Sequence, residues 1–500
     1  MVEYKTARQQ CSAIRESDGF TCGLRLATLF ALLACAACGG SEPSEDNVRS
    51  TSSNTADSPE LNFDSAQALN DLYTGTADSE NLCAGFDGSK LRRSVPRVDK
   101  PPFLEPYRDP TFGAKVTRIT DGVFGEVNKP AYSTMQAWNS DESLMILYRT
   151  GVEDGGHFLH DGHSYERIRY LDIFPSDIED VFWSYKDPNS FYYISQDQEK
   201  KGYFLRANAV TGEEMLVLDT NQVCSAGNQA TAGNDVQMHS HDDDIFGFRC
   251  PVTDDRSVAF TYQQSTGEVV TLDIGGNSGI DGDIAPMVAP SGERFLIPPV
   301  LLSENLTETN FDIDYAQSEH SSTGKAWNGE DAFFSTIFNG SPRGCDDETW
   351  RGVSHLTEFN LEQRTCRTIL NQSDGWPPTL SGTHVSATGY KKPGWVAFSS
   401  IGTKDLHYLT SETLEGRSAP VFFSEIVLVN THPEEPAVCR LAQHRSNGRG
   451  ARNGGYDPYF SEPHVTLSPS GTRLLFGSDW YDSGTVDAYV VELPAYDPNP

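Results

Sequence analysis

Positive charge is scarce in this 500-residue chain, which has 38 lysines and arginines against 71 aspartates and glutamates. The formal net charge of −33 would repel a phosphate backbone, and no basic run is long enough to offset it. We therefore expect no nucleic-acid partner. The chain also lacks a G-x-S-x-G elbow, an H-E-x-x-H motif, a phosphate-binding loop and a dinucleotide fingerprint. These absences leave the common hydrolase, zinc-protease and nucleotide-dependent classes without support.

Long apolar runs are also missing, with one exception at residues 24–38 (LRLATLFALLACAAC). This run is shorter than the roughly 20 residues of a bilayer span and is typical of the hydrophobic region of an export signal. Residues 32–35 (LLAC) resemble the bacterial lipobox, in which the cysteine is acylated. Both Cys35 and Cys38 are candidates for lipidation, and an ordinary cleaved signal peptide is the alternative. We expect an exported lipoprotein at the outer membrane or cell surface, or a periplasmic or secreted protein.

Composition divides the chain into four parts. Residues 39–62 are rich in serine and acidic residues and have almost no large apolar side chain, so they cannot bury enough surface to fold. We expect a signal peptide with a lipobox at 1–38, a disordered tether at 39–62, an N-terminal extension at 63–112 that packs on the main domain, and that domain at 113–495.

Six cysteines remain after the signal, an even number that predicts three disulfides in an oxidising compartment. Local spacing favours two pairs, and the third would tie the N-terminal extension to the last part of the fold. The expected pairs are Cys224–Cys250, Cys345–Cys366 and Cys83–Cys439.

A zinc site is the alternative for two of these cysteines. Cys224, His239, His241 and Cys250 have a tolerable spacing, although it matches no zinc-finger pattern.

One motif recurs seven times along the chain: a polar or His-bearing strand, a turn, and a short apolar strand. The copies span residues 131–148, 177–194, 236–248, 281–297, 319–337, 381–400 and 461–480. Each unit has the length of a four-stranded propeller blade, and its Pro, Ser, Asp or Gly turn suits a hairpin. We therefore predict an all-β, seven-bladed β-propeller, closed by residues 115–120 (KVTRIT) beside the last repeat. A two-sheet sandwich or a pair of smaller β domains is the alternative.

The repeats also carry a family resemblance. SEPHVTLSPSGTRLLFGSDW (461–480) resembles the repeat of TolB-like propellers and of the oligogalacturonate lyase family, and DPTFGAKVTRITD with YSTMQAWNSDESL is similar to secreted propellers grouped with ulvan lyases. The resemblance covers about residues 105–495 and is more specific for fold than for activity. It implies a surface-anchored, monomeric lyase that cleaves uronate-containing anionic polysaccharide or oligosaccharide by β-elimination. The alternative is a non-catalytic glycan-binding or protein-interaction propeller lipoprotein, and in either case a lipid anchor would be the only contact with the membrane.

Polar residues recur at one point of the repeats. Alignment on the turns makes Gln136, His384 and His464 equivalent, and His239 and His320 stand before the turns of two other repeats. We expect these five to face one axial funnel. Simple hydration of a polar channel is the alternative.

The resemblance implies a ligand set for a divalent metal such as Mn²⁺, Ca²⁺ or Zn²⁺. Oligogalacturonate lyase-like enzymes hold a metal at this location with several His and one Gln, so His384 and His464 would be ligands, joined by others of the five. Around His464 the family has further Gln and His ligands, whereas this chain offers Tyr459, Ser461 and Glu462. Glu462 would be a substitute oxygen donor.

Ulvan lyase-like propellers use His or Tyr for proton transfer instead, and that resemblance favours His157 or His160, directly after the first repeat. β-Elimination also needs a group that neutralises the substrate carboxylate, because the C5 proton is only weakly acidic. The residues placed for this role near inner-strand ends are Lys129, Arg445 and Arg449, with His444 beside them.

Overall fold

A computed structural model describes much of the chain after the expected signal and tether. The described residues are 82–153, 155–224, 229–232, 237–253, 256–276, 280, 284–297, 300–312, 320–337, 354–376, 383–400, 418–446 and 458–498. The export signal, the tether, both candidate lipidation cysteines, Cys345 and Arg449 lie outside them. Within the described ranges, no helix has the length and apolar character needed to cross a membrane.

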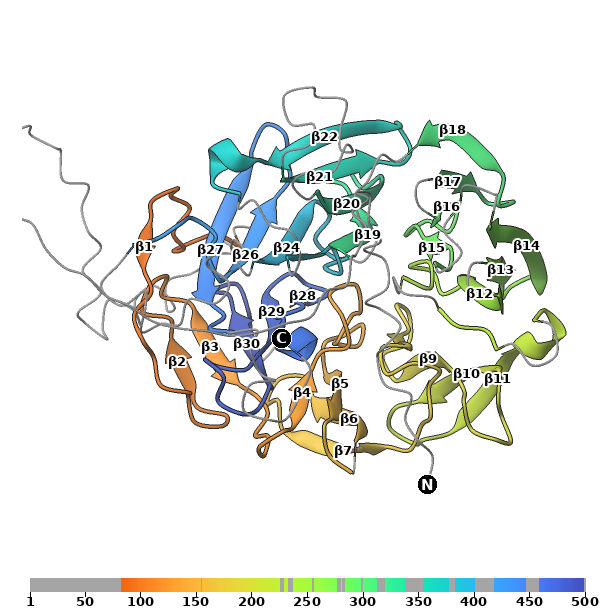
Figure 1. Cartoon of the computed structure of the whole chain (residues 1–500), viewed down its shortest axis with the longest axis horizontal. Helices are drawn as coiled ribbons and strands as arrows, with labels where there is room; N and C mark the ends of the chain where they lie inside the picture. The colour runs from red at the N-terminus through yellow and green to blue at the C-terminus, as the bar shows by residue number, and fades with distance from the viewer. Residues whose placement is uncertain are drawn as a thin grey trace, which may run out of the picture. The chain divides into compact units, whose positions relative to one another are not determined.

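Seven antiparallel sheets succeed one another along the chain as the blades of a β-propeller (Figure 1). Blade 1 contains β4 (Val127–Lys129), β5 (Leu144–Thr150), β6 (Gly156–Asp161) and β7 (Arg167–Leu171). Blade 2 contains β8 (Val181–Trp183), β9 (Ser190–Ile194), β10 (Tyr203–Asn208) and β11 (Glu214–Asp219). Blade 3 contains β12 (Ile245–Thr253), β13 (Arg256–Gln263) and β14 (Glu268–Gly275), with an inner bridge between His239 and Phe246. Blade 4 contains β15 (Met287–Val288), β16 (Arg294–Ile297), β17 (Val300–Ser303) and β18 (Glu308–Asp312).

The remaining blades follow the same order. Blade 5 contains β19 (Ser321–Lys325), β20 (Asp331–Ile337), β21 (His355–Asn360) and β22 (Thr365–Leu370). Blade 6 contains β23 (His384–Ser386), β24 (Trp395–Ser400), β26 (Glu425–Asn430) and β27 (Ala437–Gln443). Blade 7 contains β28 (Thr466–Leu467), β29 (Arg473–Ser478) and β30 (Asp487–Glu492), followed in the same sheet by β3 (Lys115–Arg118) and β2 (Pro106–Arg108). Each predicted repeat falls on one blade.

Turn chemistry and apolar packing explain why the repeats form blades. Gly292 and Gly471 end the Pro-Ser-Gly turns of blades 4 and 7 with φ of 76° and 74°, a conformation that costs little only for glycine. Between blades, the Phe204 ring of blade 2 packs on Phe246 and Phe248 of blade 3, with centroids 4.9 and 5.0 Å apart. Apolar contact thus occupies the faces of the sheets, and the inner edges can carry polar groups.

Blade 1 departs from the predicted pattern at its inner edge. The polar segment expected to form the inner strand is joined to β5 only by a bridge between Trp138 and Met145, and β4 pairs further along the same strand. The chain turns between them, where Met135 N donates to Tyr132 O at 3.1 Å. This turn holds Tyr132 at the inner edge.

The ring closes as the sequence predicts. β3 pairs antiparallel with β30 from Lys115–Glu492 to Arg118–Tyr489, so a strand from before the first blade completes the last one. Val116 in the middle of β3 is fully buried. β3 thus covers the edge that β30 would otherwise expose.

The N-terminal extension is fastened to blade 6. Cys83 and Cys439 form a disulfide with Cα atoms 5.3 Å apart, and β1 (Arg93–Ser94) pairs with β25 (Ser418–Ala419). Arg440 contributes by pairing with Glu425 at 2.7 Å and donating to the carbonyl of Leu91 at 2.6 Å.

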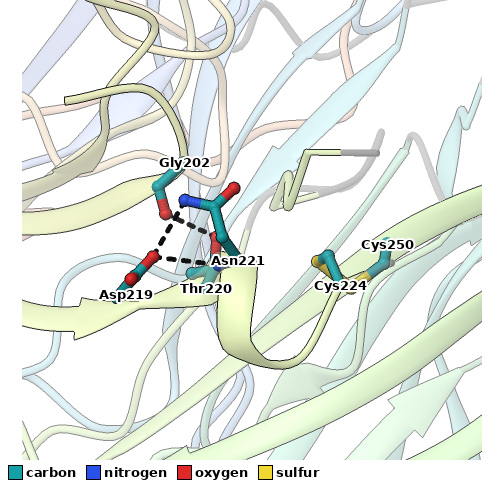
Figure 2. Close-up of a disulfide and its surroundings, with 6 residues drawn as sticks. All are labelled: Gly202, Asp219, Thr220, Asn221, Cys224 and Cys250. Carbon is teal, nitrogen blue, oxygen red and sulfur yellow. Dashed lines mark hydrogen bonds between the residues drawn. A yellow bond between two sulfur atoms is a disulfide. The ribbon is translucent and has the colours of Figure 1, made fainter. Parts of the chain in front are cut away.

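A second disulfide, Cys224–Cys250, lies directly after η1 (Thr220–Gln222), where the Asp219 side chain accepts the Asn221 N–H at 3.2 Å (Figure 2). Its thiols are therefore not available for the alternative zinc site. Cys366 is also disulfide-bonded, and Cys345, its expected partner, lies outside the described residues. In the part of the chain that the structure describes, the other 3-10 helices are η3 (Gln372–Asp374) and η4 (Pro458–Ser461).

We expect Val116→Asp to lower the free energy of unfolding in urea by at least about 3 kcal/mol, because it buries an unpaired carboxylate in the closing strand. Val123→Asp is the matched control, since Val123 is 62% exposed nearby and should change stability by less than about 0.5 kcal/mol. Equal stability of the two variants would show that β3 does not hold the ring closed.

Candidate functional site

Three buried histidines from three blades meet where the inner strands begin. His384 is the first residue of β23, His464 precedes β28, and His320 precedes β19. The ring centroids of His320 and His384 are 4.4 Å apart, and those of His384 and His464 are 4.3 Å apart. We call these three residues the histidine group. They are three of the five candidates for an axial ligand set, and they stand far apart in the sequence.

Glu462 adds a carboxylate to this group. Its Oε2 lies 3.8 Å from His384 Nε2 and 3.6 Å from His464 Nε2, and one ligand atom from each of the three residues lies within 4.8 Å of the others. Metal–ligand bonds of about 2.0–2.2 Å require donor atoms a few ångströms apart, as these are. Two imidazoles and one carboxylate suit a first-row divalent cation. His464 Nε2 is buried and has no hydrogen-bond partner among the described residues, so this set fits a divalent metal ion.

Lys129 is in contact with His464 and is completely buried. Its Nζ donates to the carbonyl of Glu462 at 3.1 Å and contacts His464 Nδ1. Burial lowers the pKa of Lys129 to about 7, although the charges of Glu179 and Glu462 act in the opposite direction. Burial, Lys129 and the other two histidines hold the pKa of His464 well below 6.5, so its ring is neutral at neutral pH.

Two tyrosines surround the same rings. Tyr132 lies 5.4 Å from His384 and 4.9 Å from His464 between centroids, and Tyr459 lies 4.9 Å from His464. The Tyr459 hydroxyl donates to Glu179 Oε1 at 3.3 Å. Burial raises the pKa of Tyr459 well above 10, which keeps its phenol protonated, and burial also raises the pKa of Glu179 to about 8.

Sequence reasoning missed Tyr132 and Glu179. Tyr132 is the second residue of the first repeat and lies in a turn, where a strand was predicted. Glu179 belongs to the connection between blades 1 and 2, where an acidic residue is unremarkable in so acidic a chain. The repeat pattern predicts only residues on the inner strands. It does not predict site residues that lie in the segments between strands.

The tautomer of His320 is fixed by the backbone. Its Nδ1 lies 2.8 Å from the carbonyl of Thr383, which can only accept, so Nδ1 carries the proton and Nε2 the lone pair. Burial lowers the pKa of His320 to about 4. This ring can therefore accept a proton or bind a cation through Nε2.

Gln136 and His239 lie outside the histidine group. Gln136 Nε2 donates to the carbonyls of Thr388 and Leu467 at 3.0 and 2.9 Å and so joins the inner edges of blades 6 and 7. His239 forms an isolated bridge with Phe246, and its Nε2 lies 3.3 Å from Asp243 Oδ1. The structure therefore brings together three of the five expected axial residues, because equal distance from a turn does not mean equal depth along the axis.

A small cavity of about 30 Å³ marks the channel beside these two residues. Gln136, Gln237, Tyr185 and His241 line it, and the rings of Tyr185 and His241 lie 4.3 Å apart. The cavity has room for about one water molecule.

The histidines after the first repeat are separated by the alternation of β6. His157 Nε2 donates to the carbonyl of Ile178 at 2.7 Å, and His160 Nδ1 donates to the carbonyl of Tyr165 at 3.0 Å. Because they are three positions apart on one strand, they face opposite sides of blade 1. Burial lowers the pKa of each to about 4.

His444 and Arg445 are both bound within the fold. His444 Nδ1 accepts the Ser446 N–H at 3.0 Å, and its Nε2 donates to the carbonyl of Ser400 at 3.1 Å. Arg445 Nη1 pairs with Asp109 Oδ2 at 2.9 Å, with both side chains completely buried. In these positions, both nitrogens of His444 are used and Arg445 joins blade 6 to the N-terminal extension.

No protein-family model and no curated protein matches the sequence. Solved structures do match. An oligogalacturonate lyase in complex with manganese aligns with a TM-score of 0.52 and 15% identity over 81% of this chain and 99% of that one. The oligogalacturonate lyase of Vibrio parahaemolyticus gives 0.51 and 14% over 78% and 96%. This chain has the propeller fold of oligogalacturonate lyase. A putative TolB from Agrobacterium tumefaciens gives 0.30 and 11% over 74% and 91%.

We expect Asp109→Asn to lower the free energy of unfolding by about 3–5 kcal/mol, because it leaves the buried Arg445 guanidinium without its carboxylate. Asp99→Asn, an exposed position of the same extension, is the control. Urea unfolding followed by fluorescence measures both. Unchanged stability of Asp109→Asn, together with lost activity, would instead favour Arg445 as a group that binds the substrate carboxylate.

Proposed function

We propose that the protein is a lyase that cleaves uronate-containing anionic polysaccharide or oligosaccharide by β-elimination at the histidine group. The observation that carries the proposal is the meeting of three buried imidazoles with Glu462, Lys129 and protonated Tyr459 where the inner strands of blades 5, 6 and 7 begin. The shared fold with oligogalacturonate lyase supports the same reaction class.

The chemistry assigns a role to each residue type. A uronate loses its C5 proton only when the negative charge of the adjacent carboxylate is offset, a neutral base accepts the proton, and an acid protonates the leaving oxygen. His320 is suited to the base role through its Nε2 lone pair. Tyr459 is suited to the acid role, since its phenol stays protonated and Glu179 holds its hydroxyl.

A metal would complete this arrangement. His384, His464 and Glu462 are the residues that would hold it, and manganese in the oligogalacturonate lyase structure favours Mn²⁺. When bound, the cation would supply positive charge for the uronate carboxylate. Lys129 orients the His464 ring from its other nitrogen.

We further propose that the protein is exported and works as a monomer, anchored by a lipid at Cys35 or Cys38. The disulfides Cys83–Cys439 and Cys224–Cys250 support an oxidising compartment. An anionic glycan outside the cell is compatible with this placement.

His320→Ala and Tyr459→Phe should each lower kcat by about 10²–10⁴-fold, because each removes one proton-transfer group. The measurement is the ultraviolet absorbance of the unsaturated product on pectate, alginate and ulvan, with and without Mn²⁺. His432→Ala, outside the site, is the control.

Wild-type protein that shows no absorbance change on any polyanion would contradict the lyase proposal. If it still bound one of these glycans, the non-catalytic glycan-binding function would replace it.

His464→Ala and Glu462→Gln should lower the affinity for Mn²⁺ by about 100-fold or more, since each removes or weakens a ligand. Isothermal titration of the full chain with MnCl₂ measures this directly. Glu434→Gln, an exposed acid on the connection after β26, serves as the control. Wild-type affinity in both site variants would place any bound ion elsewhere.

A further inference from the structure

A cavity of about 380 Å³ lies between the closing blade and blade 1. It is lined by residues of the extension around Phe103, of the end of β3, and of β4 to β7. No residue of the histidine group lines it. Phe103 is 41% exposed and the Asp121 side chain is 63% exposed, so the cavity opens to solvent. Its size is in the range of small-molecule sites.

The charged groups of this cavity differ in how fully they are paired. Asp121 pairs with Arg118 at 2.9 Å, and Glu126 pairs with Arg149 at 2.6 Å. Arg167 also lines the cavity but forms no ion pair with any residue that the structure describes. Its guanidinium is therefore the cationic group available to a ligand, and guanidinium binds carboxylates through two parallel hydrogen bonds.

Acceptors and apolar surface accompany this cation. His160 is buried in the cavity wall and uses Nδ1–H on the carbonyl of Tyr165, which leaves the Nε2 lone pair to accept a hydrogen bond. Glu166 lines the same cavity and adds carboxylate acceptors. Phe103 and Phe158 supply aromatic surface, and the Arg167 guanidinium lies 5.1 Å from the Phe158 ring centroid.

We propose that this cavity is a second carbohydrate site that binds one uronate residue. The carboxylate pairs with Arg167, the sugar hydroxyls donate to His160 Nε2 and Glu166, and a C–H face of the ring packs on Phe103. One cation, two acceptor groups and an aromatic wall match the one carboxylate, several hydroxyls and apolar ring face of such a sugar. The site is distinct from the histidine group, and the proposal does not depend on whether the chain is a lyase.

The test uses monomeric D-galacturonate, which contains no glycosidic bond to cleave, in isothermal titration with the full chain. We expect Arg167→Ala to weaken binding by about ten-fold or more through loss of a charge-assisted contact, and Phe103→Ala to weaken it as well. Arg256→Ala, an exposed arginine on β13, is the matched control and should bind like the wild type.

Neutral D-galactose distinguishes recognition of the carboxylate from recognition of any sugar, and we expect it to bind at least about ten-fold more weakly. Wild-type binding by Arg167→Ala, equal affinity for galactose, or no galacturonate binding by the wild-type chain would each overturn the proposal. Both decisive positions are exposed, so their substitution does not threaten folding. A flat lyase assay on polymers would leave this result untouched, which separates failure of the two proposals.

Discussion

Pairing of β3 with β30 is the constraint on which the arrangement of the blades depends. The ion pair between Lys115 and Glu492 across these strands joins residues 377 positions apart. Each blade packs its apolar faces on its neighbours, so the inner edges keep their places only while the ring is closed. The histidine group draws on blades 5, 6 and 7 and is therefore sensitive to an opening at the last of them. Pairing between strands so far apart in the sequence also makes folding slow, because the entropy cost of closing the loop comes before the stabilising contacts form.

Burial then decides what the polar inner edges can do. Lys129, His320 and His464 are taken out of water together, and desolvation favours the uncharged form of each. Neutral imidazoles can bind a cation or accept a proton, whereas charged ones can do neither. Tyr459 is affected in the opposite sense, since burial retains its proton. A single physical effect thus separates potential acceptors from a potential donor within one site.

The sequence predicts the fold well because a propeller is a repeat, and a repeat is visible without knowledge of contacts. The turn at Gly471 and the apolar strand after it are local features, as is the closing strand at residues 115–118. The site depends on depth along the axis, which repeats do not encode. His384 and His464 are recognised by their shared offset, but His239 follows the same rule and lies apart from them, beside Asp243. Glu179 and Tyr132 lie in segments between strands, which the repeat pattern does not describe. The side chains of Arg445 and His444 are bound to other residues of the fold.

The small cavity beside Gln136 has a consequence for any polymer that this protein handles. Gln136 joins blades 6 and 7, and the space beside it admits about one water molecule. A glycan strand does not fit through this point while the hydrogen bonds of Gln136 are in place. A chain that keeps to one side of it would meet the histidine group side-on or by an end, without the processive sliding that a tunnel permits.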